Sequence, residues 1–197
     1  MRIYFNASLA GKADHLEEYQ KIVDVIKKIG HEVVADHIMK RNFEDVNRQS
    51  KEQHAKDFQK ARKEIKNSDA MIIEGTAPSI GVGLLMGIAL DIYKPVLILY
   101  LTTPHGLLLG DPNRLLTIVR YDLKNENKLK YTIETFLKKT KTKTLKYKFN
   151  LMINEVQNNY LEWTSSGSRI SKAEILRNLI DEKITKDTVY KKILRKI

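Results

Sequence analysis

Short apolar runs alternate with longer amphipathic stretches over the first 139 residues of this 197-residue chain. Short apolar runs are typical of buried strands, and apolar positions spaced three or four residues apart are typical of helices. The pattern predicts strands at residues 2–6, 33–35, 70–73, 95–101 and 116–121, and helices at 16–29, 49–67, 84–93 and 127–138.

Buried strands that are separated by helices predict an α/β domain over residues 1–139, with a parallel sheet between two layers of helices. Gly30 is expected to end the first helix, because glycine readily adopts the left-handed conformation found after helices. In sheets of this kind, ligands bind beyond the carboxyl ends of the strands. The segments that follow the predicted strands are therefore the places to look for a site.

The pattern changes after residue 139, where Lys and Thr alternate over a short linker at residues 140–144. Beyond it, apolar and polar residues alternate with the period of two that is typical of a strand. The apolar set is Leu145, Tyr147, Phe149 and Leu151, and the polar set is Lys146, Lys148 and Asn150. We predict a strand–helix–helix unit over residues 145–197, with helices at 155–165 and from Ser171, and with Trp163 filling the core between them.

The residue types present exclude several kinds of site. The chain has no cysteine, which excludes disulfides and cysteine-ligated metals. The five histidines lack metal-binding spacings, so we expect neither a metal nor a cofactor. His37, His54 and His105 are expected on solvent-exposed loops or helix faces. No stretch has the character of a signal peptide or a membrane span, which predicts a cytoplasmic protein without a membrane partner.

Positive charge is concentrated in the tail. The formal net charge is +11, and residues 140–197 contain 13 Lys and Arg against 6 Asp and Glu. A basic tail favours binding to nucleic acid or another polyanion. The alternative is that lysine-rich composition only keeps the protein soluble.

The segment from Glu74 to Gly83 lies between a predicted buried strand and an apolar helix. Gly81 and Gly83 would allow the backbone to approach a ligand closely. The Ser79 hydroxyl and the free N–H groups at the start of the helix suit an anion. The alternative is an ordinary tight turn that contains glycine.

These features, taken together, resemble the nucleoside 2-deoxyribosyltransferase family, which includes the 2′-deoxynucleoside 5′-phosphate N-hydrolases. The resemblance covers about residues 1–139. It is carried by residues 4–11 (Tyr-Phe-Asn-Ala-Ser-Leu-Ala-Gly), Asp69, Glu74, Thr76, 78–83 (Pro-Ser-Ile-Gly-Val-Gly) and 87–89. It implies a flavodoxin-like (Rossmann-like) three-layer fold, a homodimer and a nucleoside or nucleotide ligand. The ligand-binding residues that we expect are Tyr4, Ser8, Gly11, Glu74, Ser79, Gly81 and Gly83.

Two positions depart from the family pattern. The family uses a glutamate nucleophile where this chain has Leu85, and a supporting carboxylate where it has Ala61. Leucine and alanine cannot capture or stabilise an oxocarbenium-like transition state. Glu74 is the first candidate to replace the missing group, although it would equally suit fixing the loop by accepting backbone N–H bonds. Asp57, one helical turn before Ala61, is the second.

The tail resembles a ribbon-helix-helix DNA-binding domain, in which two chains pair their strands and insert them into the major groove. The resemblance implies that the apolar set faces the core and that Lys146, Lys148 and Asn150 face bases. Ser171 and Lys172, at the start of the second helix, would hold a phosphate. The alternative is a structural appendage that packs on the first domain or dimerises it.

Three hypotheses follow from these patterns. The first is a catalytically inactive nucleotide-binding protein coupled to a DNA-binding dimer, which would act as a ligand-responsive regulator. The second is an active nucleoside 2-deoxyribosyltransferase or nucleotide N-glycoside hydrolase that uses Glu74 or another carboxylate. The third is an interaction module with an empty pocket.

Overall fold

The computed structural model describes residues 1–102, 113–141, 149–168 and 170–190. Contacts within the chain divide it into two compact units, Met1–Lys146 and Tyr147–Ile197, which are described separately here. Within the described ranges, no helix is long and apolar enough to cross a membrane.

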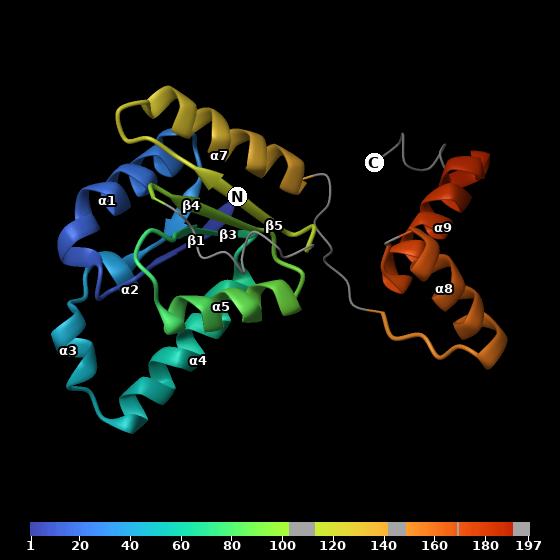
Figure 1. The fold of residues 1–197 in the computed structure, drawn as a ribbon, viewed down its shortest axis with the longest axis horizontal. Helices are drawn as coiled ribbons and strands as arrows, with labels where there is room; N and C mark the ends of the chain where they lie inside the picture. The colour runs from blue at the N-terminus through green and yellow to red at the C-terminus, as the bar shows by residue number, and fades with distance from the viewer. Residues whose placement is uncertain (103–112, 142–148, 169, 191–197) are drawn as a thin grey trace. The chain divides into compact units, whose positions relative to one another are not determined.

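Five parallel strands form a single sheet in the first unit (Figure 1). They are β1 (Arg2–Ala7), β2 (Glu32–Val34), β3 (Ala70–Glu74), β4 (Val96–Tyr100) and β5 (Leu116–Arg120), arranged in the order β2-β1-β3-β4-β5. The predicted α/β fold with a parallel sheet is thereby confirmed. The direction of the strand order changes between β1 and β3, so the carboxyl ends of these two strands flank the crevice where such folds bind ligands.

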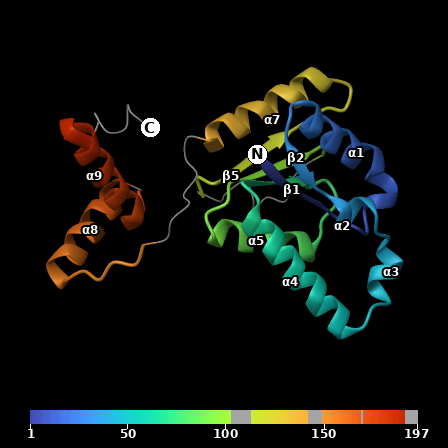
Figure 2. The same ribbon diagram turned by 180° about the vertical axis from the view of Figure 1, so that it is seen from behind.

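Helices cover both faces of the sheet (Figures 1 and 2). Helices α1 (Lys12–Lys28) and α7 (Glu126–Lys141) lie on one face, and α4 (Lys51–Asn67) and α5 (Ile80–Asp91) lie on the other. Two short helices, α2 (Asp36–Met39) and α3 (Phe43–Asn47), connect β2 to α4. The structure thus has the three layers that the alternation of strands and helices predicts.

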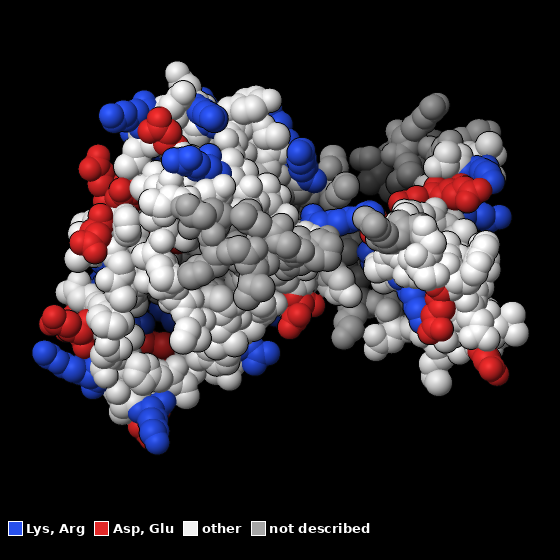
Figure 3. Space-filling model, viewed as in Figure 1, with Lys and Arg blue, Asp and Glu red and all other residues white. Residues whose placement is uncertain are grey.

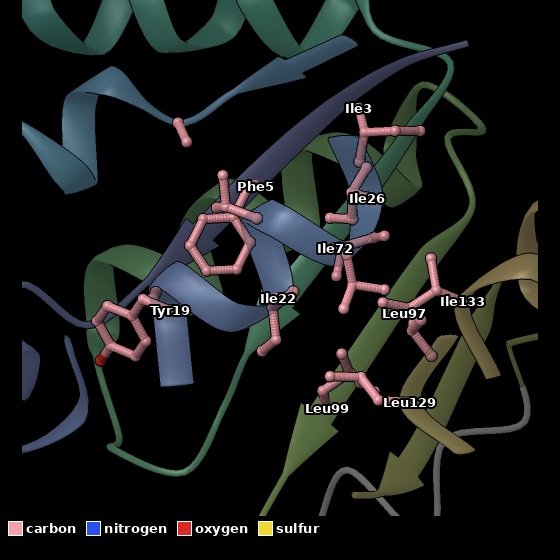
Figure 4. Close-up of a cluster of buried hydrophobic side chains, with 14 of the residues drawn as sticks. Ile3, Phe5, Tyr19, Ile22, Ile26, Ile72, Leu97, Leu99, Leu129 and Ile133 are labelled. Atoms are coloured by element: carbon pink, nitrogen blue, oxygen red, sulfur yellow. The ribbon is translucent and has the colours of Figure 1, made fainter. Parts of the chain in front are cut away.

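The alternation of side chains along each strand builds two separate apolar cores. Ile3 and Phe5 of β1 point toward α1 and α7, whereas Tyr4 between them belongs to the core beneath α4 and α5. Figure 4 shows the first core, in which strand side chains pack against helical ones. Its labelled members are Ile3, Phe5, Tyr19, Ile22, Ile26, Ile72, Leu97, Leu99, Leu129 and Ile133.

Several element boundaries differ from the sequence-based prediction. Helix α5 begins at Ile80 rather than at residue 84, so only residues 80–83 of the predicted ligand-binding loop lie in this helix, as its first turn. Helix α7 continues to Lys141 and occupies the start of the predicted linker. Gly30 does end α1, with φ of 85°, as expected.

The second unit contains two described helices, α8 (Glu155–Ser168) and α9 (Lys172–Lys186). Of the predicted strand at 145–151, the structure describes residues 149–151, and these have no regular structure. Residues 145–148 lie outside the described ranges. Phe149 and Leu151, which were predicted to face a core, are exposed in the single chain. Trp163 is 72% exposed, so the prediction that it fills the space between the helices is wrong.

Candidate functional site

The loops after β1 and β3 meet at the carboxyl edge of the sheet. A side chain at Gly11 would overlap the methyl group of Ala77, so the two loops touch where only glycine fits. Ser8 is buried, and its hydroxyl accepts a hydrogen bond from the Gly11 N–H at 3.2 Å. The Ser8 carbonyl accepts another from the Tyr19 hydroxyl at 3.0 Å. Ser8 and Gly11 therefore shape the crevice through local bonding.

Glu74 is fully buried at the end of β3. Its carboxylate accepts hydrogen bonds from the Thr76 backbone N–H and hydroxyl, and from the Tyr121 hydroxyl at 3.2 Å. Burial raises the pKa of the Glu74 carboxyl, although the bonds from Thr76 and Tyr121 act in the opposite direction. This is the arrangement expected of a residue that fixes the loop rather than one that attacks a ligand.

Ser79 caps the amino end of α5. Its hydroxyl accepts a hydrogen bond from the Val82 N–H at 3.4 Å, which satisfies one of the free donors of the helix. Gly81 and Gly83 lie in the exposed first turn. A Cβ atom at Gly83 would meet no other atom within 4 Å, so this glycine leaves open space. The helix start remains accessible to an anion.

A cavity of about 410 Å³ lies between the β1–β2 edge of the sheet and helices α2 and α4. In Figure 3, a hollow over the region that Figure 1 labels α2, α3 and α4 shows both basic and acidic side chains. The polar residues that line the cavity are Arg2, Tyr4, Glu32, Asp36, His37, Arg41, Asp57, Lys60 and Glu64. Of the ligand-binding residues predicted from sequence, only Tyr4 lies in this lining.

Four buried polar atoms of the cavity lining make no hydrogen bond with the described residues, although one of them, Oδ2 of Asp57, lies in an ion pair with Arg41. The other three are Nη1 of Arg2, the hydroxyl of Tyr4, a side chain that is only 1% exposed, and Nε2 of His37. The two rings stack with their centroids 4.5 Å apart. Burial, which is the main cause, lowers the pKa of His37 to about 4, so the imidazole is neutral at neutral pH. Unpaired buried polar atoms are costly, and a ligand that bonded to them would remove that cost.

Asp57 supplies a carboxylate to the same cavity from α4. It forms an ion pair with Arg41 at 2.6 Å and accepts a hydrogen bond from Gln53 at 3.0 Å. Burial opposes ionisation of Asp57, but the bonds from Arg41 and Gln53 outweigh it and lower the pKa of the carboxyl. Lys12 donates hydrogen bonds to the backbone carbonyls of Met39 and Arg41, both at 2.8 Å, and thereby positions Arg41. The cavity thus contains an ionised carboxylate.

Residues 3–152 match the family model for nucleoside 2-deoxyribosyltransferase. The chain belongs to this family. The match extends beyond the 1–139 region over which the sequence motifs predicted it.

Similar proteins with specific names support the same assignment. The chain is 32% identical over 123 residues to a protein of Methanosarcina mazei named as a 2′-deoxynucleoside 5′-phosphate N-hydrolase, covering 60% of this chain and 74% of that protein. It is 32% identical over 104 residues to the 5-hydroxymethyl-dUMP N-hydrolase of Tetraodon nigroviridis, covering 51% and 70%. The structure of Clostridium botulinum CMP N-glycosidase, BcmB, is 19% identical with a TM-score of 0.46, covering 68% of this chain and 99% of that one, a similarity too weak to support an inference.

Leu85 and Ala61 stand where the family resemblance places its two carboxylates. Both side chains are partly buried and pack against the core that contains Tyr4 and Met71. Neither can accept a proton or stabilise a cation. Asp57 precedes Ala61 by one helical turn, and both line the cavity. Two carboxylates of α4 flank this position in the cavity lining: Asp57, and Glu64, which lies three residues after Ala61 and pairs with Arg2.

The residues predicted to bind DNA have other roles or lie outside the described ranges. Lys146 and Lys148 are among the latter, and Asn150 is exposed but not in a strand. Ser171 caps α9 by accepting the Glu174 N–H at 3.3 Å. The Lys172 ammonium donates to Asn158 at 2.9 Å and to Glu162 at 2.7 Å. Neither finding supports a phosphate site here, and DNA binding and the ribbon-helix-helix fold stay predictions.

His37 and Arg41 belong to the site but were not predicted from the sequence. His37 was expected on a solvent-exposed loop or helix face, whereas its Nε2 is buried in the cavity lining. One signal was present, because Asp36 and His37 follow directly after a predicted strand, at the edge where ligands bind. Arg41 offered no such signal, since only the fold brings it beside Asp57.

Proposed function

We propose that this chain binds a nucleoside or nucleotide in the cavity between β1, α2 and α4 and hydrolyses its N-glycosidic bond. The observation that carries the proposal is that an ionised Asp57 and the Tyr4 hydroxyl, which has no hydrogen-bond partner among the described residues, line the same cavity. The family assignment and the names of the similar proteins support the same class of ligand and reaction.

In this proposal Asp57 supplies the negative charge that the reaction needs. Hydrolysis breaks the bond between the sugar C1′ and the base nitrogen, and the electron pair leaves with the base. Water adds its hydroxyl to C1′, and its proton balances the charge on the base. A carboxylate near C1′ stabilises the oxocarbenium-like transition state. Arg41 keeps Asp57 ionised and oriented for this task.

The start of α5 would contribute the anion-binding part of the site. The Ser79 hydroxyl and the first N–H groups of the helix lie after β3, next to the strand at which the order of the sheet reverses. Helix amino termini attract phosphate because their N–H groups are free and the helix dipole is positive there. A 5′-phosphate is therefore the group that we assign to Ser79 and Gly81.

A second candidate function is binding without turnover. It is favoured by Leu85 and Ala61, which place apolar side chains where the family resemblance expects carboxylates. Under this alternative, Asp57 and Arg41 hold a ligand but do not act on C1′. Both candidates require that a nucleoside or nucleotide binds, so binding and base release must be measured separately.

The test incubates the full chain with each deoxynucleoside and ribonucleoside, free and as the 5′-monophosphate, and measures free base by chromatography. Our proposal predicts base release that falls at least about 100-fold in Asp57→Asn, the size expected for loss of a catalytic carboxylate. Asp36→Asn is the matched control, because Asp36 also lines the cavity but is exposed and pairs with Lys40. Its rate should stay within about threefold of the wild-type rate.

A thermal-shift assay with the same compounds separates the two candidates. A ligand that binds only the folded chain raises the melting temperature. A rise without base release would support binding without turnover, and base release that survives Asp57→Asn would assign the chemistry to another group. Neither a shift nor base release with any compound would contradict both candidates.

A further inference from the structure

The acidic side chains that line the cavity between β1, α2 and α4 are already paired with cations of the chain. The pairs are Glu32 and Glu64 with Arg2, Asp36 with Lys40, and Asp57 with Arg41. Because the charge of each carboxylate is balanced within the protein, none of the four requires a donor from a ligand.

The Arg2 guanidinium, by contrast, keeps a nitrogen without a partner. Its Nε donates to Glu32 at 2.8 Å, and its Nη2 donates to Glu64 at 2.5 Å. The third nitrogen, Nη1, is buried and has no hydrogen-bond partner among the described residues. An arginine side chain can only donate, and the two glutamates fix the orientation of its planar fork. Nη1 is therefore a fixed, unsatisfied donor on a residue that lines the cavity.

The Tyr4 hydroxyl is a second unsatisfied donor from the same strand. Arg2 and Tyr4 are two residues apart in β1, so their side chains lie on the same face of the sheet, toward α4. The hydroxyl is buried and has no hydrogen-bond partner within the described ranges. Burial, which is the main cause, raises the pKa of the Tyr4 phenol, so it keeps its proton at neutral pH and can donate.

The other two unpaired polar groups of the lining do not need a donor either. Nε2 of His37 donates or accepts, depending on the tautomer. Lys60 is exposed, forms no ion pair with the described residues, and can only donate. Once the internal pairs are formed, the cavity therefore requires acceptors from a ligand.

The charge of the lining separates two kinds of acceptor, an uncharged carbonyl oxygen and an anionic phosphate. The cations Arg2, Arg41 and Lys60 face four carboxylates, and His37 is neutral, so the lining has one more negative charge than positive charges. A phosphate would bring further negative charge into a partly desolvated site that is already negative, which is unfavourable. A carbonyl oxygen accepts hydrogen bonds without adding charge. The lining therefore favours the carbonyl.

The position of Arg2 relative to Asp57 indicates which part of the ligand carries this oxygen. Arg2 bonds to Glu64, which follows Asp57 by seven residues, or about 10 Å along α4. In the proposed function Asp57 lies near C1′. The base is attached to C1′ and extends away from the sugar and its phosphate, so it is the group that can reach Arg2 and Tyr4.

We propose that the cavity selects nucleosides whose base carries a carbonyl oxygen on the edge far from the sugar, and that Arg2 and Tyr4 are the donors that determine this specificity. The inference rests on the proposed function and names the substrate class within it. Uracil and hypoxanthine have such an oxygen, whereas cytosine and adenine have an amino group in its place. An amino group would set a donor against the fixed N–H groups of Arg2 and leave both unsatisfied.

Thermal-shift titration of the full chain tests the proposal with matched compounds. The pairs are uridine with cytidine and inosine with adenosine, in ribo and deoxy forms, free and as the 5′-monophosphates. The dependence of the melting temperature on ligand concentration gives the affinity. We expect each carbonyl compound to bind at least about tenfold more tightly than its amino counterpart. Equal affinities within the pairs, or tighter binding of the amino compounds, would overturn the proposal.

A matched pair of variants assigns the preference to Arg2. Arg2→Lys keeps a positive charge beside the two glutamates but removes the planar fork. Arg48→Lys makes the same change at an exposed residue that pairs with Glu44 and does not line the cavity. The preference for carbonyl compounds should fall to within about twofold in Arg2→Lys and stay as in the wild type in Arg48→Lys. If Arg2 had only a structural role, its loss would weaken both members of a pair equally and leave the preference unchanged.

Tyr4→Phe removes only the hydroxyl that has no partner within the described ranges, so it tests the second donor in a chain that is expected to fold even if Arg2→Lys does not. The preference should fall at least about threefold, the size expected for one hydrogen bond. A preference that is unchanged in Tyr4→Phe would contradict the role of Tyr4, and one that is unchanged in both variants would overturn the proposal.

The remaining outcomes separate this inference from the proposed function. Inorganic phosphate that competes with uridine in the wild type but not in Arg2→Lys would assign the donors to an anion and overturn the inference. Binding and base release without a preference for carbonyl compounds would contradict the inference alone. The preference without base release would support it and contradict the proposed hydrolysis. Absence of binding by every compound would contradict both.

Discussion

His37 shows how one residue's surroundings decide its charge. Burial is the largest cause of its lowered pKa, and the positive charges of Arg41 and Lys60 act in the same direction. The negative charges of Asp36 and Glu64 act in the opposite direction but do not compensate. The imidazole thus enters the cavity as a neutral group.

This shift makes stability depend on pH. In the unfolded chain His37 has a pKa of 6.5, and in the folded chain about 4, so the unfolded chain binds more protons between these values. The stabilising contribution is fully present above pH 6.5 and is lost as the pH falls toward 4. The variant His37→Phe keeps an aromatic ring beside Tyr4 but has no group to protonate. Over this pH window its free energy of unfolding should therefore decrease by up to ~3 kcal/mol less than that of the wild-type chain.

Urea unfolding of both proteins at pH 7 and pH 4.5 measures the difference. The comparison between them cancels the other titrating groups, which both chains share. Equal losses in the two proteins would show that His37 is not the neutral, buried group described here.

Single residues of the site were predictable from sequence only in part. Tyr4 was predicted to border the pocket, and it lines the cavity. His37 was placed wrongly because its burial depends on α4, which lies some twenty residues further along the chain. A local sequence pattern does not reveal contacts between segments that are so far apart in the chain. Asp57 was identified as a candidate from its position one turn before Ala61, but its partner Arg41 was not.

At the scale of elements, the start of α5 depends on one hydroxyl. Replacing Ser79 with alanine removes the cap and should destabilise the first unit by about 1 kcal/mol. Replacing it with glycine should cost only a few tenths of a kcal/mol, since glycine is tolerated at this position. Chemical denaturation of the full chain measures both.

The same pair of variants separates capping from ligand binding at Ser79. If the hydroxyl also binds a phosphate, both variants should weaken nucleotide binding even though only Ser79→Ala loses stability. Unchanged nucleotide affinity in Ser79→Gly would limit the residue to its capping role.

Regular apolar patterns predicted the strands well, whereas glycine-containing and isolated segments were predicted less well. The segment with Gly81 and Gly83 was expected to be a loop, yet the cap at Ser79 allows the helix to begin before them. The tail strand was predicted from alternation alone. Alternation gives the face that a strand would bury but does not provide the neighbouring strand that it needs.

For the molecule as a whole, most of the buried apolar side chains among the described residues lie in the sheet and helices of the first unit. Ile72 of β3 is fully buried between the sheet and its helices, and replacing it with alanine should cost about 2–5 kcal/mol. Ile80 is 94% exposed, so its replacement by alanine should change stability by less than about 0.5 kcal/mol. Urea unfolding followed by circular dichroism compares the two. A large loss in Ile80→Ala would mean that another surface covers it.

The family match covers residues 3–152, and the second unit lies almost entirely beyond it. The fold and ligand class of the first unit could therefore be predicted from shared motifs. The role of the second unit has to be argued from its own described surface, on which Trp163 is exposed.

The contact between Gly11 and Ala77 has a consequence for motion. Because the two loops touch where no side chain fits between them, neither can move toward the other without displacing it. The Gly11 loop and the Ala77 loop should therefore show similar amide order parameters, close to those of the strands. A crevice whose rims are already rigid loses little conformational entropy when a ligand arrives, so more of each contact's energy appears as affinity.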